Sequence, residues 1–152
     1  MKIRNAIKSD IQSLSKIDSF WNIKQFDEEL DAPFSSIFII ESNSSECTNT
    51  KTKLESHNHK IEILGFISIR IIDNTCDIMN IAVNKSFRNQ RIGTTLLSYI
   101  LKNIHCKIFT LEVSANNTYA IKLYKKLGFN NIHIRKNYYK DSDAIIMQKH
   151  LI

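Results

Sequence analysis

Apolar residues recur along the chain with two different periods, and these periods predict alternating strands and helices. Apolar runs and period-two stretches predict strands at residues 2–6, 35–40, 61–72, 76–83, 107–113, 129–135 and 144–150. Apolar residues three or four apart predict helices beginning near Ser9 or Asp10, around Phe26, after Gly93–Thr94 and after Asn116–Asn117. The order β-α-α-β-β-β-α-β-α-β-β predicts an α/β (α+β) domain with a mixed sheet and helices on both of its faces.

Local signals fix several details of this prediction. Asp73–Asn74 lies between two apolar runs and predicts the turn of an antiparallel hairpin. Gly128 follows the last apolar residue of a helical stretch and predicts the end of that helix. In the stretch 107–113 the large apolar side chains share one face of a strand, so Glu112 lies on the other face.

One long segment carries no periodic pattern. Residues 41–60 are rich in Ser, Asn and Thr, so we expect residues 42–60 to form a flexible surface loop. No repeat and no composition shift divides the remainder, and the chain of 152 residues is therefore expected to be a single domain, 1–152.

Composition and charge narrow the class of partner. The net charge of +6 favours anionic partners such as phosphates, a nucleotide cofactor or a ribonucleoprotein surface. Lysines are spread along the chain, so direct reading of nucleic acid is not expected. Three widely spaced cysteines, a beginning without the apolar run of a signal peptide and short apolar stretches predict a cytoplasmic protein without disulfides or a membrane span.

A basic turn between a strand and a helix is the first candidate site. The stretch I-M-N-I-A-V-N-K-S-F-R-N-Q-R-I-G-T runs from Ile78 to Thr94 and contains Lys85, Arg88 and Arg91. The first N–H groups of a helix have no internal acceptors and the helix dipole is positive at that end, so this turn is suited to a phosphorylated ligand. A solvated basic turn before an ordinary helix is the alternative.

Two other kinds of site have little support. His57, His59 and Cys47 lie in the polar segment without a fourth ligand at suitable spacing, so no metal is expected. No Ser-His-Asp or Cys-His pattern for a covalent nucleophile is visible.

Four separated motifs stand in the second half of the chain: N-I-A-V with F-R-N-Q-R-I-G-T, then L-E-V-S-A-N-N, then A-I-K-L-Y-K-K-L-G-F, and finally R-K-N-Y-Y with D-A-I-I-M-Q-K-H-L. Together they resemble the GNAT acetyltransferases, and most of all the RimI group of ribosomal-protein-alanine N-acetyltransferases. The first half matches only through S-F-W-N and the element order. The resemblance implies the GNAT fold, with a mostly antiparallel sheet of about seven strands, and acetyl-CoA as cosubstrate.

The resemblance also implies a reaction and a partner. A monomer would transfer the acetyl group of acetyl-CoA by direct attack to the N-terminal α-amine of a protein, the N-terminal alanine of a small-subunit ribosomal protein. An α-amine titrates near 8 and lysine near 10.4, so deprotonating the α-amine at neutral pH costs about 3 kcal/mol less. A carboxylate base therefore suits an α-amine better than a lysine.

Cofactor contacts follow from the same resemblance. The edge formed by Ile81, Ala82 and Val83 would pair with the pantetheine arm, and the Val83 N–H would donate to the thioester oxygen. A plain buried strand explains these side chains equally well. Asn117 would contact the arm or the pyrophosphate, in addition to capping its helix. The pyrophosphate would be held by Arg88, Asn89, Gln90, Arg91, Ile92, Gly93 and Thr94.

Two residues acquire catalytic roles by the resemblance. Glu112 would be the general base, and Tyr124 would protonate the departing thiolate as the general acid. For Glu112 the alternative is a surface carboxylate on an exposed strand face. Tyr124 lies on the apolar stripe of its helix, so a purely structural core tyrosine is the alternative there.

Aromatic residues would form the acceptor groove. The resemblance assigns Tyr138 and Tyr139, placed just before the last strand, to the substrate-binding site. Trp21 would form the opposite wall, although its neighbours fit a core position as well. An aromatic pair that covers the end of the sheet is the alternative for the two tyrosines.

The sequence departs from the family pattern at two places. Arg91 stands where the family's turn usually has its first glycine, and only Lys140–Ser142 join N-Y-Y to the last strand. The second departure and the 41–60 segment leave open an enzyme that acetylates another protein or a small amine. Arg91 leaves open a non-catalytic module that binds acetyl-CoA or the ribosome.

Overall fold

The computed structural model describes residues 1–42 and 61–151. The predicted flexible loop, the two histidines and Cys47 therefore lie almost wholly outside the described residues. The elements are β1 (Lys2–Asn5), η1 (Lys8–Asp10), α1 (Ile11–Ile17), α2 (Ile23–Asp31), β2 (Ser35–Glu41), β3 (Ile63–Ile72), β4 (Thr75–Val83), η2 (Lys85–Phe87), α3 (Ile92–Asn103), β5 (Ile108–Ser114), α4 (Thr118–Lys126), β6 (Asn130–Tyr139) and β7 (Ser142–His150).

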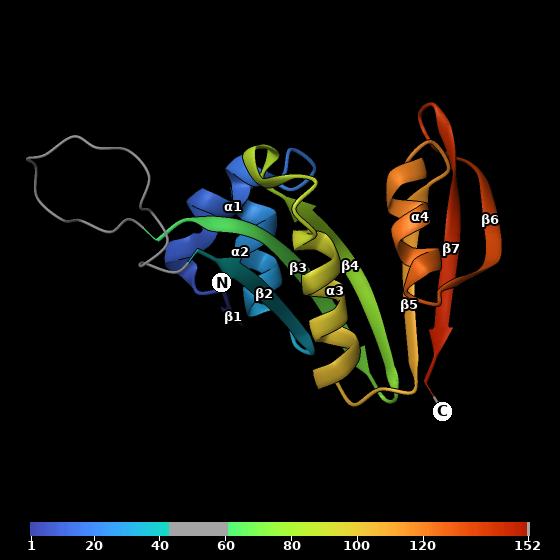
Figure 1. Ribbon diagram of the computed structural model, residues 1–152, viewed down its shortest axis with the longest axis horizontal. Coiled ribbons are helices and arrows are strands. Elements are labelled where there is room, and N and C mark those ends of the chain that lie inside the picture. Colours follow the sequence, from blue (N-terminus) through green and yellow to red (C-terminus); the bar gives the residue numbers. More distant parts are fainter. Residues whose placement is uncertain (43–60, 152) are drawn as a thin grey trace, which may run out of the picture.

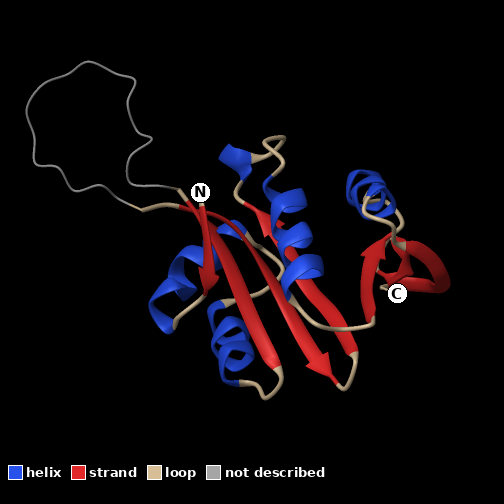
Figure 2. Ribbon diagram, turned by 60° about the horizontal axis from the view of Figure 1, so that its bottom comes forward, coloured by secondary structure: helices blue, strands red, loops and turns tan. Residues whose placement is uncertain are grey.

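The strands form one mixed sheet whose order is β1-β2-β3-β4-β5-β7-β6. Every neighbouring pair is antiparallel except β4 and β5, which are parallel because α3 crosses from one to the other. Helices α1 and α2 cover one face, and α3 and α4 cover the other (Figures 1 and 2). The predicted element order, the mixed sheet and the two helical layers are confirmed.

Each helical layer has its own core. Under α1 and α2, the fully buried ring of Phe26 lies edge-to-face against Trp21 and Phe66, with ring centroids 5.4 and 5.2 Å apart. Under α3 and α4, the buried side chains Leu96, Leu97, Ile100, Phe109 and Tyr124 form a larger cluster. The helical stripes read from the sequence therefore face the sheet.

Glu29 connects α2 to the sheet through a buried carboxylate that is 5% exposed. It accepts hydrogen bonds from the hydroxyls of Ser35 at 2.6 Å and Ser68 at 3.3 Å, and it forms an ion pair with Arg70 of β3. Burial alone would raise the pKa of Glu29, but these hydrogen bonds outweigh burial and the pKa lies below its ordinary value.

Two predicted boundaries are wrong. The strand predicted at residues 35–40 ends one residue too early, because Glu41 is the last residue of β2, where its buried carboxylate pairs with Arg4 at 2.9 Å. Tyr138 and Tyr139 were placed in a connection, but β6 extends through both, and only Lys140 and Asp141 separate it from β7. Hydrogen bonding across the hairpin prolongs the strand beyond its apolar pattern.

A bulge in β4 divides the sheet. Ile78 pairs with Ile69 of β3 and Asn80 pairs with Ser68, so Met79 has no cross-strand partner. On its other side β4 pairs with β5 only from Thr75 to Ile78. Beyond the bulge the two strands diverge toward their C-terminal ends, as Figure 1 shows. In the described ranges, 1–42 and 61–151, no helix is long and apolar enough to cross a membrane.

Candidate functional site

The diverging end of β4 presents unpaired backbone to the gap. Asn84 N–H donates to the Leu64 carbonyl at 2.9 Å, which makes this pair a hydrogen-bonded one. Hydrogen-bonded and non-hydrogen-bonded pairs alternate in an antiparallel ladder, so the N–H and C=O groups of Val83 and Ile81 point away from β3. They face the side from which β5 has separated. A slender amide-bearing chain could therefore pair with this edge.

The basic turn ends at the N-terminus of α3. Asn89 and Arg91 have left-handed backbones, with φ of 63° and 60°. The first backbone bond of α3 runs from Thr95 N–H to the Arg91 carbonyl at 2.9 Å, so the three preceding N–H groups have no acceptor within the helix. The Arg88 guanidinium lies 3.5 Å from the Val83 carbonyl and closes the open end of the β4 edge.

Arg91 occupies a backbone conformation that favours glycine, which explains the family's usual residue there. A left-handed backbone costs an L-residue about 1–2 kcal/mol, whereas glycine loses roughly 0.5–1 kcal/mol more in conformational entropy on folding.

We expect Arg91→Gly to raise the free energy of unfolding by about 0.5 kcal/mol and to weaken the binding of pyrophosphate several-fold, because a cation leaves the turn. Urea denaturation and calorimetry measure the two effects. Arg91→Ala is the matched control, since it removes the cation and keeps the left-handed backbone. Equal stability of the glycine and alanine variants would contradict the strain argument.

A cavity of about 580 Å³ lies between the β4 edge, the turn, α1 and α4. Most of the residues predicted to hold the cofactor line it: Ile81, Ala82, Val83, Arg88, Asn89, Arg91, Ile92, Gly93, Thr94 and Asn117. Gln90 is exposed and does not line it. The side chain of Asn117 also caps α4, because its oxygen accepts from Ala120 N–H at 3.1 Å.

Gly93 gives a test of whether the cavity fits a phosphorylated ligand. A Cβ at Gly93 would meet only Val83 Cγ2 at 3.6 Å and Leu123 Cδ2 at 3.7 Å, both ordinary contacts. Protein packing therefore does not require glycine here. Without a side chain, the backbone of the first helical turn is open to the cavity and to the cations around it, which is the chemistry that a pyrophosphate needs.

Tyr124 reaches the same cavity from α4. Its side chain is 6% exposed and packs against Phe129, yet it lines the cavity. Burial, and next the nearby Tyr139, raise the pKa of Tyr124 to about 12. The hydroxyl therefore holds its proton throughout the neutral range.

Glu112 lies on the opposite face of the sheet from Tyr124. Leu111 and Val113 are buried toward α4, so the carboxylate between them points to the other face, where its side chain is 27% exposed. Strand β5 is an inner strand, between β4 and β7. Glu112 pairs with Arg135 of β6, with Oε2 3.1 Å from Nη1.

The predicted acceptor residues lie near this second face. Burial, and next the charge of Glu112, raise the pKa of Tyr139, so Tyr139 lies within electrostatic reach of both Glu112 and Tyr124. Tyr138 is 54% exposed and contacts Tyr139 edge-to-face at 5.2 Å. Trp21 belongs to the α1–α2 core and lines a second, smaller hollow of about 430 Å³.

The sequence did not predict that residues at and after the C-terminal end of α1 form one wall of the cavity. Ser15, Asp18 and Ser19 line both hollows, and Asp18 accepts a hydrogen bond from Asn80 at 2.6 Å. Only the fold brings this loop to β4, so no local pattern could have revealed it. Tyr119 and Leu123 could have been found, since they share the helix with Asn117 and Tyr124. Among residues 1–42 and 61–151, no three His, Cys, Asp or Glu side chains gather as metal ligands.

Comparison with known proteins identifies the arrangement. An Escherichia coli (strain K12) [ribosomal protein bS18]-alanine N-acetyltransferase is 34% identical over 93 residues, which are 57% of this chain and 63% of that relative's length. A Bacillus subtilis (strain 168) protein, provisionally given the same name, is 30% identical over 95% of this chain and 92% of its own. The crystal structure of the E. coli ribosomal-protein-S18-alanine N-acetyltransferase superposes with a TM-score of 0.77 at 26% identity, covering 98% and 92% of the two chains.

The sequence model of the acetyltransferase (GNAT) family matches residues 11–129, from the start of α1 to Phe129, which lies just after α4. The match includes the β4 edge, the basic turn, Glu112 and Tyr124. Since it spans more than half of the sequence, the chain belongs to the acetyltransferase (GNAT) family.

Proposed function

We propose that this protein transfers an acetyl group from acetyl-CoA to the N-terminal α-amine of a protein. The observation that carries the proposal is the arrangement around the diverging β4–β5 pair. A cationic cavity at the open β4 edge is lined by Tyr124, and Glu112 lies on the face of the sheet opposite to Tyr124. An acyl donor and an acceptor could therefore approach the gap from opposite sides.

The β4 edge and the α3 N-terminus are the proposed binding elements for the cosubstrate. Backbone groups of Ile81 and Val83 would pair with the pantetheine arm, and the free N–H groups of α3 with Arg88 and Arg91 would hold the pyrophosphate. Gly93 would leave room for that contact. Bound acetyl-CoA supplies a thioester carbonyl carbon that an amine can attack directly.

Three groups of the protein would then act on the reacting atoms. Glu112 takes the proton of the attacking amine, directly or through a water molecule. The Val83 N–H donates to the carbonyl oxygen as negative charge develops there. Tyr124 keeps its proton at neutral pH and offers it to the sulfur as the C–S bond breaks. Because the amine attacks the thioester directly, no covalent enzyme intermediate is required.

The proposed acceptor is the N-terminal alanine of a small-subunit ribosomal protein. The support is the sequence similarity to relatives that are named [ribosomal protein bS18]-alanine N-acetyltransferases. Mass spectrometry of small-subunit ribosomal proteins from cells that lack this chain should reveal one N-terminus that has lost its acetyl group. Unchanged acetylation of every N-terminus would refute this acceptor.

A direct assay tests the reaction itself. The purified protein is incubated with acetyl-CoA and a peptide that begins with alanine and also contains lysine, and tandem mass spectrometry locates the acetyl group. We expect it on the α-amine alone. Acetylation of lysine, or of spermidine in a parallel reaction, would contradict the acceptor class. Calorimetric binding of acetyl-CoA without any transfer would point instead to a non-catalytic module.

Tyr124→Phe tests the general acid. The phenylalanine keeps the ring that packs on Phe129 and removes only the hydroxyl, so we expect a kcat that is about 100-fold lower, the lower end of what acid–base catalysis contributes. The thermal midpoint and the calorimetric affinity for acetyl-CoA should stay close to those of the wild type. An unchanged kcat would leave Tyr124 as a core residue only.

A further inference from the structure

The charged side chain of Arg135 reaches the carboxylate of Glu112, and the mechanism above gives this arginine no role. Arg135 extends from β6 to Glu112 on β5, although β7 lies between these strands. The register places Arg135 opposite Ala144, and Glu112 opposite Ile146. Ala144 is fully buried. Its small side chain leaves room for the arginine to cross β7 on this face.

A bulge in β6 holds the guanidinium in place. Register is lost between Arg135 and Tyr139, where Asn137 has a left-handed backbone with φ of 52°. Its N–H donates to Asp143 Oδ1 at 2.8 Å. In a regular strand, residues three apart point to opposite faces. Between the pairs Arg135–Ala144 and Tyr139–Ser142, β6 has three residues and β7 has one, so this segment is not a regular strand. The ring centroid of Tyr138 lies 5.4 Å from the guanidinium carbon of Arg135.

Among the described residues, neither Arg135 nor Glu112 forms an ion pair with any other side chain. Within the described part of residues 71–151, the Arg135–Glu112 pair is the only ion pair that the structure contains. Arg135 uses Nη1 toward one carboxylate oxygen, Oε2, and leaves Oε1 available for a proton. An arginine stays charged and remains a donor throughout the reaction. It can therefore fix the carboxylate without exchanging a proton with it.

We propose that Arg135 is a positioning residue, which holds the carboxylate of Glu112 in the orientation that deprotonates the acceptor amine, and that Tyr138 holds Arg135. The proposal rests on the proposed function, because it assumes Glu112 as the base. In this proposal the ring of Tyr138 packs against the guanidinium of Arg135 and keeps it beside Glu112. Without Arg135, the carboxylate would sample several side-chain rotamers in water, and only a fraction would face the amine.

Steady-state kinetics with acetyl-CoA and an alanine-starting peptide test the positioning role. Arg135→Gln should lower kcat by about 10-fold and leave the KM for acetyl-CoA within about twofold. Arg135→Lys should recover part of this loss, since it keeps the charge but not the planar fork. Lys136→Gln is the matched control: it removes the same charge from the neighbouring exposed residue and should leave kcat unchanged.

A double-mutant cycle decides whether Arg135 acts through Glu112. In a Glu112→Gln background, Arg135→Gln should change the residual kcat by less than about twofold, because both residues serve one carboxylate. An equal loss in both backgrounds would overturn the proposal, and so would an unaffected kcat in Arg135→Gln alone. A loss of the same size in Lys136→Gln would also overturn it.

A readout without turnover separates this proposal from the proposed function. Nuclear magnetic resonance of the guanidinium should show slow rotation about the Cζ–Nη bonds of Arg135 in the wild type, and fast rotation in Glu112→Gln and Tyr138→Ala. Fast rotation in the wild type would overturn the positioning role, whatever the activity. If rotation is slow but the protein acetylates no amine, Arg135 does hold the carboxylate of Glu112, and only the proposed function is refuted.

Discussion

Glu112→Gln is expected to lower kcat for acetyl transfer to an α-amine by about 100-fold or more, the range that a positioned general base contributes. Glutamine has nearly the same shape and keeps an oxygen near Arg135, but it cannot take a proton from the amine. Affinity for acetyl-CoA should stay within about twofold, because Glu112 is not among the residues that line the cavity.

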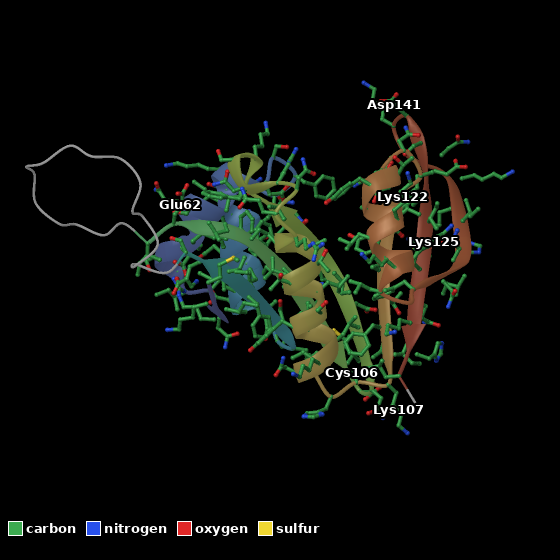
Figure 3. All side chains as sticks on the ribbon, in the orientation of Figure 1. Glu62, Cys106, Lys107, Lys122, Lys125 and Asp141 are labelled. Atoms are coloured by element: carbon green, nitrogen blue, oxygen red, sulfur yellow. The ribbon has the colours of Figure 1, made fainter. Side chains whose placement is uncertain are left out.

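A matched control is available on the neighbouring hairpin. Asp141 lies at the tip of the β6–β7 hairpin, as Figure 3 shows, and it does not line the cavity. Asp141→Asn removes the same charge from the same side of the molecule and should leave kcat unchanged. Steady-state rates for both variants at saturating acetyl-CoA give the comparison. A Glu112→Gln enzyme as fast as Asp141→Asn would remove Glu112 from the mechanism.

Glu29→Gln is expected to lower the free energy of unfolding by about 2–3 kcal/mol, toward the lower end for breaking a buried ion pair, since Arg70 is partly exposed. The amide can accept fewer hydrogen bonds than the carboxylate, so the hydroxyls of Ser35 and Ser68 and the guanidinium compete for one oxygen. Urea denaturation measures the loss. Glu28→Gln, one residue earlier on the exposed side of α2, is the control and should cost less than about 0.5 kcal/mol.

The same carboxylate contributes to acid sensitivity. Since the pKa of Glu29 in the folded protein lies below its ordinary value of 4.5, its contribution is complete above pH 4.5 and is lost as the pH falls through the folded pKa. The unfolding free energy of the wild type should therefore fall below pH 4.5 more steeply than that of Glu29→Gln. If the unfolding free energies of the two proteins fall in parallel with pH, Glu29 does not contribute this pH-dependent stability.

The local features of the fold could be predicted because their causes are local. The Asp73–Asn74 turn, the Gly128 helix end and the Asn117 cap each depend on a few neighbouring residues. Arg91 was recognised as unusual from the sequence, and its left-handed backbone gives the physical reason. For the same reason the order of helices and strands followed from periodicity alone.

Features that depend on strand register could not be predicted. The missing partner of Met79 results from the way β4 aligns with β3, and the sequence around it reads as an uninterrupted strand. Arg135 reaches Glu112 only because β6 pairs with β7 and then bulges at Asn137. The contact of Asp18 with Asn80 joins segments that are far apart in the sequence. Pairing across the sheet fixes these contacts, and no short motif records it.

The bulge at Met79 also bears on how the protein avoids aggregation. Unpaired strand edges usually recruit strands from other chains, and natural sheets protect them. Here the unpaired edge from Ile81 to Val83 lies inside the molecule, with α1, α3 and α4 lining the cavity in front of it. A polypeptide strand carries side chains on both of its faces and would collide with these helices. The edge therefore excludes foreign strands by its surroundings and admits only a narrow, unbranched chain.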